Sequence, residues 1–87
     1  MPRVFIPPAL KSLCGNAKSL ELEASSVRDV IAALEERFPG AADRLCRDGR
    51  LTPGLAVVIN GRASALGIHQ AVAAADEIHF LPAIGGG

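Results

Sequence analysis

The chain has 87 residues, 49% of them apolar and 21% charged, with nine basic residues balancing nine acidic ones. This length allows one small domain with a thin core, and the composition favours a packed globule over disorder. Zero formal charge argues against nucleic acid and anionic membranes as partners, and three Phe without Trp or Tyr leave few side chains for stacking on bases.

The cysteines and the first residues bear on the compartment. Cys14 and Cys46 are too few for a disulfide scaffold, and with only two histidines at no ligand spacing they predict no zinc site. We expect both to be small buried residues in a reducing compartment. The apolar stretch Val4–Ile6 is too short for a signal peptide, and no apolar run is long enough to span a membrane. The sequence therefore predicts a soluble, cytoplasmic protein without bound cofactor or metal.

Two strands joined by a long loop are predicted at the start of the chain. Arg3 to Ile6 carries the β-branched and aromatic residues typical of a strand, and two prolines end it. Over residues 18–23, Leu20 and Leu22 alternate with polar residues, which indicates a strand with one face on a core. Residues 9–17 are expected to form the connection, with a Gly-Asn turn near its end.

The clearest prediction is a helix from Ser26 to Phe38. Ser26 can cap it, and Asp29 stands three residues later, as in a capping box with Asp in place of Glu. The predicted buried stripe has helical spacing and consists of Val27, Val30, Ile31, Leu34 and Phe38. Pro39-Gly40 should stop the helix. Outside the stripe, Glu35 and Glu36 are expected on a solvated helix face.

The second half of the chain predicts further strands. A helical turn is expected over Ala41 to Arg47 with Leu45 inward, followed by loops at 48–49 and 53–54. Leu55 to Ile59 is apolar throughout and should be a central strand. Asn60-Gly61 predicts a tight turn. Residues 62–75 are expected to be a loop with a brief strand or turn near 64–68.

The last predicted strand is Glu77 to Leu81, and Pro82 should end its pairing. Strands with one main helix across a mixed sheet define an α+β fold. Alternation assigns one face of the sheet to the core, namely Val4, Ile6, Val57, Ile59, Ile78 and Phe80. It places Phe5, Val58 and Leu81 on the outward face, which is either a docking patch or covered by loops.

Residues 83–87 are expected to form a tail beyond a domain of residues 1–82. Gly85, Gly86 and Gly87 have no side chain to pack, so they are either a frayed end or a strip made to enter a narrow site. In the second case the reactive group is the carboxylate of Gly87, which needs activation because oxide is a poor leaving group.

Several segments together resemble one family. They are Val4–Pro7, Ser26–Ile31, Leu34–Gly40, Val58–Gly61, Asp76–Pro82 and the final Gly86-Gly87. With these segments the chain resembles the ThiS/MoaD family of ubiquitin-like sulfur carrier proteins over essentially its whole length. The resemblance implies a β-grasp fold.

The resemblance also implies a function as a carrier and not as an enzyme. Gly87, with Gly86 beside it, would be adenylated by a ubiquitin-activating-like enzyme that uses ATP and magnesium, and then converted to a thiocarboxylate that donates sulfur. A synthase subunit would take that sulfur for molybdopterin, cysteine or thiamine-type biosynthesis. The residues expected to contact such partners are Phe5, Val58, His79, Leu81, Pro82, Ile84 and Gly85.

Two departures from the family pattern stand out. Ala74-Ala75 precede Asp76 where the family often has Asp-Gly, so this turn is expected to differ, and Gly85 lengthens the final glycine run. Two other functions stay open, a ubiquitin-like modifier that forms isopeptides and a non-catalytic binding subunit.

The remaining candidate residues predict little chemistry. Neither His69 nor His79 has a partner at catalytic spacing, and nothing near Cys46 in sequence predicts a lowered pKa. Arg44, Arg47 and Arg50 form a local basic cluster, expected to be a solvated loop or, alternatively, a contact for an acidic partner.

Overall fold

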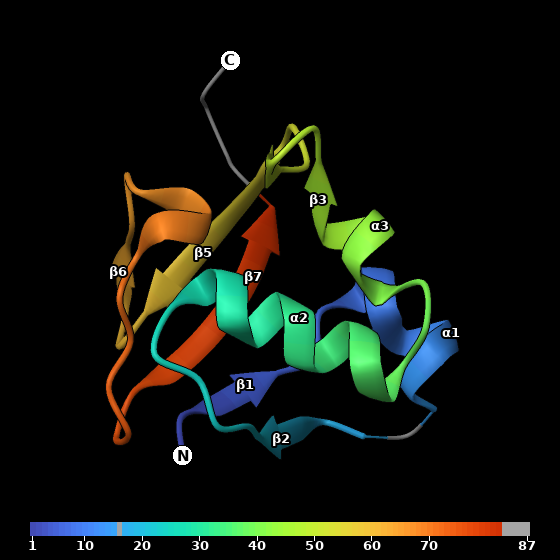
Figure 1. The fold of residues 1–87 in the computed structure, drawn as a ribbon, viewed down its shortest axis with the longest axis horizontal. Helices are drawn as coiled ribbons and strands as arrows, with labels where there is room; N and C mark the ends of the chain where they lie inside the picture. The colour runs from blue at the N-terminus through green and yellow to red at the C-terminus, as the bar shows by residue number, and fades with distance from the viewer. Residues whose placement is uncertain (16, 83–87) are drawn as a thin grey trace.

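A computed structural model describes residues 1–15 and 17–82 (Figure 1). In chain order it contains β1 (Arg3–Phe5), the 3-10 turn η1 (Pro8–Leu10), α1 (Lys11–Cys14), β2 (Ser19–Glu21), α2 (Val27–Arg37), α3 (Ala41–Leu45), β3 (Cys46–Arg47), β4 (Arg50–Leu51), β5 (Leu55–Ile59), β6 (Arg62–Ala63), the 3-10 turn η2 (Gly67–His69) and β7 (Glu77–Pro82). No helix among these residues is long and apolar enough to cross a membrane.

The main sheet is mixed, as predicted. Its strand order is β2-β1-β7-β5-β6. Strands β1 and β7 run parallel, and the other neighbouring strands of the sheet are antiparallel. Helix α2 crosses one face of this sheet (Figure 1). A mixed sheet with a single long helix on one face is the predicted α+β, β-grasp architecture. Strand β5, predicted to be central, has a neighbouring strand on each side, whereas the middle strand of the five is β7.

Helix α2 starts where the sequence predicts. The Ser26 hydroxyl accepts a hydrogen bond from the Asp29 amide at 3.1 Å. The return bond of a capping box is displaced by one residue, because the Asp29 carboxylate accepts from the amide and hydroxyl of Ser25 at 3.1 and 2.9 Å. These bonds hold the pKa of Asp29 below its ordinary value, with the Ser25 hydroxyl as the largest cause. The helix ends at Arg37, and Phe38 is its C-cap.

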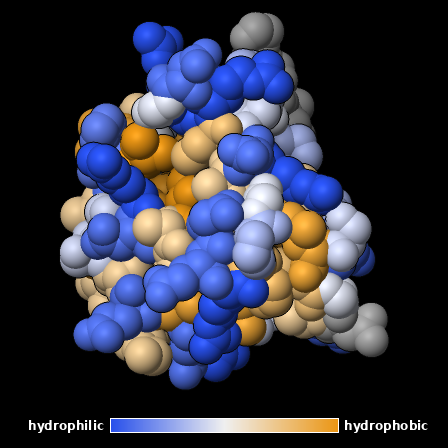
Figure 2. Space-filling model, turned by 45° about the vertical axis from the view of Figure 1, so that its right-hand side comes forward, coloured by the Kyte–Doolittle hydropathy of each residue, from blue (hydrophilic) through white to orange (hydrophobic). Residues whose placement is uncertain are grey.

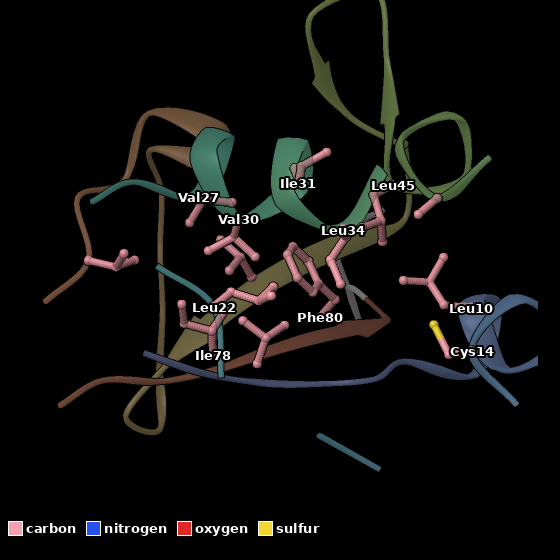
Figure 3. Close-up of a cluster of buried hydrophobic side chains, with 14 residues drawn as sticks. Leu10, Cys14, Leu22, Val27, Val30, Ile31, Leu34, Leu45, Ile78 and Phe80 are labelled. Atoms are coloured by element: carbon pink, nitrogen blue, oxygen red, sulfur yellow. The ribbon is translucent and has the colours of Figure 1, made fainter. Parts of the chain in front are cut away.

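The core lies between α2 and the sheet. In Figure 3 the side chains of Val30 and Leu34 face those of Ile78 and Phe80 on β7. Four of the predicted sheet residues are buried, namely Val4, Val57, Ile78 and Phe80, while Ile6 and Ile59 are half-buried against the core. Phe38, predicted in the helix stripe, is also only half-buried.

The connection after β1 holds structure that the sequence pattern did not indicate. Residues 8–14 form a 3-10 turn and a short helix, which bury Leu10 and Cys14. Leu10, Leu13 and Cys14 have helical spacing, but elements of three and four residues are too short for the window in which a helical period can be recognised. Gly15 adopts a φ of 62°, and Asn16 lies outside the described residues.

The region after α3 differs from its prediction. Leu45 is fully buried as expected, but Cys46 and Arg47 belong to a strand that pairs with Arg50–Leu51. Asp48 and Gly49, with φ of 54° and 76°, form the tight turn of this hairpin. Strands of two residues leave no alternation to detect in a sequence.

Two further boundaries are corrected. Within residues 62–75 the short strand lies at Arg62–Ala63, and the turn η2 lies at Gly67–His69. Pro82 does not end pairing, because it lies opposite Leu55 in the register of β7 and β5. Proline lacks the N–H donor but keeps its carbonyl acceptor, so the last position of a strand tolerates it.

Candidate functional site

The sheet face opposite α2 carries a row of apolar and aromatic side chains. The register places His79 of β7 between Phe5 of β1 and Val58 of β5. The rings of Phe5 and His79 stack with centroids 4.2 Å apart and planes 5° from parallel. All three residues are half-buried. The outward orientation predicted from alternation therefore corresponds to a packed row across three neighbouring strands.

This row continues to the end of β7. Leu81, two residues beyond His79 on the same face, is 43% exposed and lies opposite Ala56. Pro82 is also exposed. We call the surface formed by Phe5, Val58, His79 and Leu81 the outer patch. A contiguous apolar surface is a typical feature of a docking site, and here the exposed Leu81 extends a row of three half-buried residues.

Charged residues border the outer patch at the opposite end of the strands. Arg3 and Glu21 form an ion pair of 3.5 Å between β1 and β2, with both side chains more than half exposed. On the other side of β1, Glu77 of β7 lies opposite Arg3. An exposed ion pair of this kind contributes little to stability. These charged side chains form the edge of the apolar surface.

The start of β7 is fixed by hydrogen bonds that join two motifs distant in sequence. Asn60 donates from Nδ2 to Oδ1 of Asp76 at 2.8 Å, and its Oδ1 accepts from the Glu77 amide at 2.9 Å. Asp76 also accepts from the Ala73 amide at 2.7 Å through Oδ2. Its pKa is lowered, first by the Ala73 amide and then by Asn60. Asn60 and Asp76 lie in segments that carry the family resemblance, but no sequence pattern indicates that they bond to each other.

The turn before β7 does not need the glycine that the family often has there. The Asp76 amide donates to the Ala73 carbonyl at 3.0 Å, which closes the turn around Ala74 and Ala75. Neither alanine has a positive φ, since Asp48 and Asn60 are the non-glycine residues with that conformation among those described. A side chain at position 75 is therefore compatible with this turn.

Glu35 has a structural role that its predicted place on a solvated helix face did not include. One of its carboxylate oxygens accepts from the amides of Gly40 and Ala42 at 3.1 and 2.9 Å, and the other also accepts from Gly40. The Ala42 and Gly40 amides lower the pKa of Glu35. The side chain thus links the end of α2 to the start of α3, whereas Glu36 is exposed.

The predicted basic cluster is divided in the structure. Arg44 donates from Nη1 to the Ala9 carbonyl at 2.9 Å and to the Ser12 hydroxyl at 2.7 Å, so it joins α3 to the first connection. Arg47 and Arg50 lie directly opposite each other on the β3–β4 hairpin and are exposed.

The described residues contain no group of three His, Cys, Asp or Glu side chains that could hold a metal ion. Cys14 and Cys46 are free thiols, and burial raises the pKa of each. A raised pKa disfavours the thiolate, which is the nucleophilic form of cysteine. Ile84, Gly85, Gly86 and Gly87, the remaining predicted site residues, lie outside the described residues.

Comparison with known proteins gives a consistent result. The model of the ThiS family matches residues 5–87. A chain in the crystal structure of the Amycolatopsis orientalis BexX/CysO complex is 30% identical with a TM-score of 0.86, and the match covers 100% of both chains. Mycobacterium tuberculosis CysO is 27% identical with a TM-score of 0.84, over 97% of this chain and 100% of that one.

A third similar structure is small archaeal modifier protein 1 of H. volcanii, which is 25% identical with a TM-score of 0.76 over 95% of this chain and 97% of that one. None of the curated proteins matches the chain. With a family match that spans all but its first residues, and with the β-grasp fold, the chain belongs to the ThiS family of ubiquitin-like sulfur carriers.

Proposed function

We propose that this protein carries sulfur as a thiocarboxylate on Gly87. The observation that supports this most directly is that the family match extends to residue 87 and so includes Gly85, Gly86 and Gly87. The described part of the chain adds a second argument. Its two cysteine thiols have raised pKa values, which disfavours the nucleophilic thiolate, so we assign the chemistry to the glycine carboxylate and not to a thiol.

The chemistry has two steps, both on a partner enzyme related to ubiquitin-activating proteins. A carboxylate oxygen of Gly87 attacks the α-phosphorus of ATP, and pyrophosphate leaves, which gives an acyl-adenylate. A hydrosulfide-level nucleophile then attacks the acyl carbon, and the bond to AMP breaks. The products are a thiocarboxylate, AMP and a proton. Magnesium and ATP belong to the partner, and the carrier is a co-substrate.

The domain's part in this reaction is to be recognised and to present its tail. Residues 83–87 follow Pro82 directly, and Pro82 ends the strand that carries His79 and Leu81 of the outer patch. Five extended residues reach at most about 18 Å. A partner that holds Gly87 in its active site therefore has to lie against this end of the domain, where we assign contacts to the outer patch, Pro82, Ile84 and Gly85.

The test is co-production of the chain with its adenylating enzyme and a sulfide source, followed by intact-mass spectrometry. We expect ATP-dependent replacement of one oxygen atom by sulfur, localised to Gly87 by fragmentation. A chain lacking Gly86 and Gly87 is the matched control and should stay unmodified. If the full chain keeps its oxygen with active enzyme present, or if the native protein continues past Gly87 untrimmed, the proposal is wrong.

A second function is favoured by the similarity to small archaeal modifier protein 1. In that case the activated Gly87 would be attacked by a lysine amine, and an isopeptide would form. Gel ladders that resist denaturation, with Gly-Gly remnants on lysines of other proteins, would distinguish this from carriage of sulfur to a small molecule.

Both functions use the same activation step, and for both we propose that the protein works in the cytoplasm with its partners. In the sulfur-carrier function, the molecule that accepts the sulfur would be a precursor of the molybdopterin, cysteine or thiazole type.

A further inference from the structure

The β3–β4 hairpin presents two like charges at one place. Arg47 and Arg50 flank the tight turn and are direct cross-strand partners. Like charges directly opposite each other destabilise a strand pair. Neither arginine forms an ion pair with another described residue. The ion pair among the described residues joins Arg3 to Glu21, on β1 and β2. The hairpin therefore keeps an unfavourable pair that a carboxylate from outside the domain would neutralise.

The surroundings of the two arginines form a hollow. Arg47, Asp48, Arg50, Leu51 and Pro53 line a volume of about 320 Å³. Asp48, an exposed turn residue with a φ of 54°, is its one carboxylate, so the two arginines leave the lining with an excess of one positive charge. The lining thus combines two guanidinium groups with apolar surface from Leu51 and Pro53, which suits an acidic group flanked by aliphatic atoms.

A second hollow adjoins the first. It has a volume of about 210 Å³, and Arg50 and Leu51 belong to both linings. Leu66, Ile68 and His69 of the η2 region line its other side, and Leu66 is 59% exposed. Figure 2, turned about the vertical from Figure 1, keeps the hairpin end at the top, where hydrophilic side chains gather above a hollow with hydrophobic atoms. A partner would thus meet a basic site next to an apolar one.

The hairpin is anchored and lies near the end of β7. Thr52 donates from its amide to the Leu45 carbonyl at 2.9 Å and from its hydroxyl to the Arg44 carbonyl at 3.2 Å. Leu55, three residues later, lies opposite Pro82. In Figure 1 the arrowhead of β7 points towards the end of the molecule that carries this hairpin. Any protein that receives the segment after Pro82 would approach the two hollows.

We infer that Arg47 and Arg50, together with Leu66 and Ile68, form a second docking site for an acidic and aliphatic surface segment of the protein that activates the tail. This inference rests on the proposed function and deepens it. The outer patch gives such a partner apolar contact, whereas the hairpin, which is followed by Leu55 opposite Pro82, gives it a charged contact. Charge complementarity of this kind raises association rates and fixes orientation more than it adds affinity.

The experiment compares two double charge reversals that change net charge equally. R47E/R50E alters the hairpin and keeps a like-charge pair across it, while R28E/R62E alters two exposed arginines elsewhere. Binding to the adenylating enzyme with ATP is measured by stopped-flow fluorescence over a range of salt concentrations. We expect R47E/R50E to lower the association rate about tenfold at low salt and the control far less. L66S should raise the dissociation rate without changing the charge.

The outcomes separate this inference from the proposed function. If both double variants slow association equally, net charge is responsible and the hairpin site is wrong. If R47E/R50E binds and forms thiocarboxylate like the wild type, the hairpin site is wrong while the carrier function stands. If the wild type forms no thiocarboxylate, the proposed function fails, and the binding comparison still tests whether the hairpin is a docking site. Unchanged urea unfolding of R47E/R50E shows that any loss is not due to misfolding.

Discussion

Asn60 of the β5–β6 turn and Asp76 before β7 are joined by a hydrogen bond of 2.8 Å, although 16 positions separate them in the chain. Asn60 also has a φ of 52°, in the left-handed region. The residue therefore serves two purposes, turning the chain after β5 and fixing the first residues of β7. Asn60 and Asp76, which belong to the motifs that carry the family resemblance, therefore help to stabilise the fold.

The first prediction concerns Asn60. N60A removes both hydrogen bonds and places alanine in the left-handed region, whereas N60G removes the bonds and tolerates the conformation. We expect both variants to be less stable than the wild type and N60A to be less stable than N60G by about 1 kcal/mol. Urea unfolding followed by circular dichroism measures this, with an unchanged slope as control. Equal stability of N60A and the wild type would show that these bonds contribute nothing.

The second prediction concerns the pH dependence set by Glu35. Hydrogen bonds from the Ala42 and Gly40 amides lower its pKa in the folded state. A carboxyl whose folded pKa lies below its unfolded one stabilises the fold above the unfolded pKa and loses that contribution as pH falls through the folded pKa. E35Q should therefore be less stable than the wild type at neutral pH.

The difference between E35Q and the wild type should shrink as pH falls below about 4.3, the ordinary pKa of glutamate. Unfolding free energies across a pH series test this, and E36Q is the matched control, because Glu36 is exposed on the same helix. A constant difference between E35Q and the wild type down to the lowest pH would contradict the assignment.

The third prediction tests the outer patch. Leu81 is 43% exposed, so L81E should change the free energy of unfolding by less than about 1 kcal/mol. Binding to the adenylating enzyme should weaken about tenfold or more, because a carboxylate would be placed in an apolar contact. A32E adds the same charge on the exposed side of α2 and should bind normally. Calorimetric titration measures both, and equal affinity of L81E and A32E would exclude Leu81 from the interface.

The fourth prediction separates the glycine from the cysteines as the carrier of sulfur. Burial raises the pKa of Cys14 and of Cys46, so native protein should react slowly with iodoacetamide and rapidly in urea. The double variant C14A/C46A should still acquire sulfur with the adenylating enzyme, with only a moderate loss of stability. Loss of sulfur transfer in a C14A/C46A protein that remains folded would assign the chemistry to a thiol instead.

Residues that follow a strong period could be predicted from sequence. The stripe of α2 repeats an apolar position with helical spacing, β7 alternates, and β5 is apolar throughout; the structure confirms these elements, although Phe38 and Ile59 are only half-buried. The first connection and the β3–β4 hairpin contain too few residues per element for any period to appear. They form because tertiary packing buries Leu10, Cys14 and Leu45.

The candidate site shows the same division. Alternation identifies the outward residues of the sheet, but not that Phe5 and His79 stack, since this depends on the parallel register of β1 and β7. The bonds of Glu35 and Asn60 depend on turns that bring backbone amides to a side chain, and no spacing rule predicts those. Arg44 could not be separated from Arg47 and Arg50 for the same reason, because its partners are Ala9 and Ser12.

The central place of β7 has a consequence for folding. Arg3 pairs with Glu77, so the first and the last of the described strands are neighbours. Contacts between residues so distant along the chain slow folding, because a large loop must close before they form. During synthesis β1 and β5 are both made before the strand that lies between them, and β1 is made at the very start of the chain. Until then each presents an unpaired edge, and the nascent chain depends on avoiding wrong strand pairing with its neighbours.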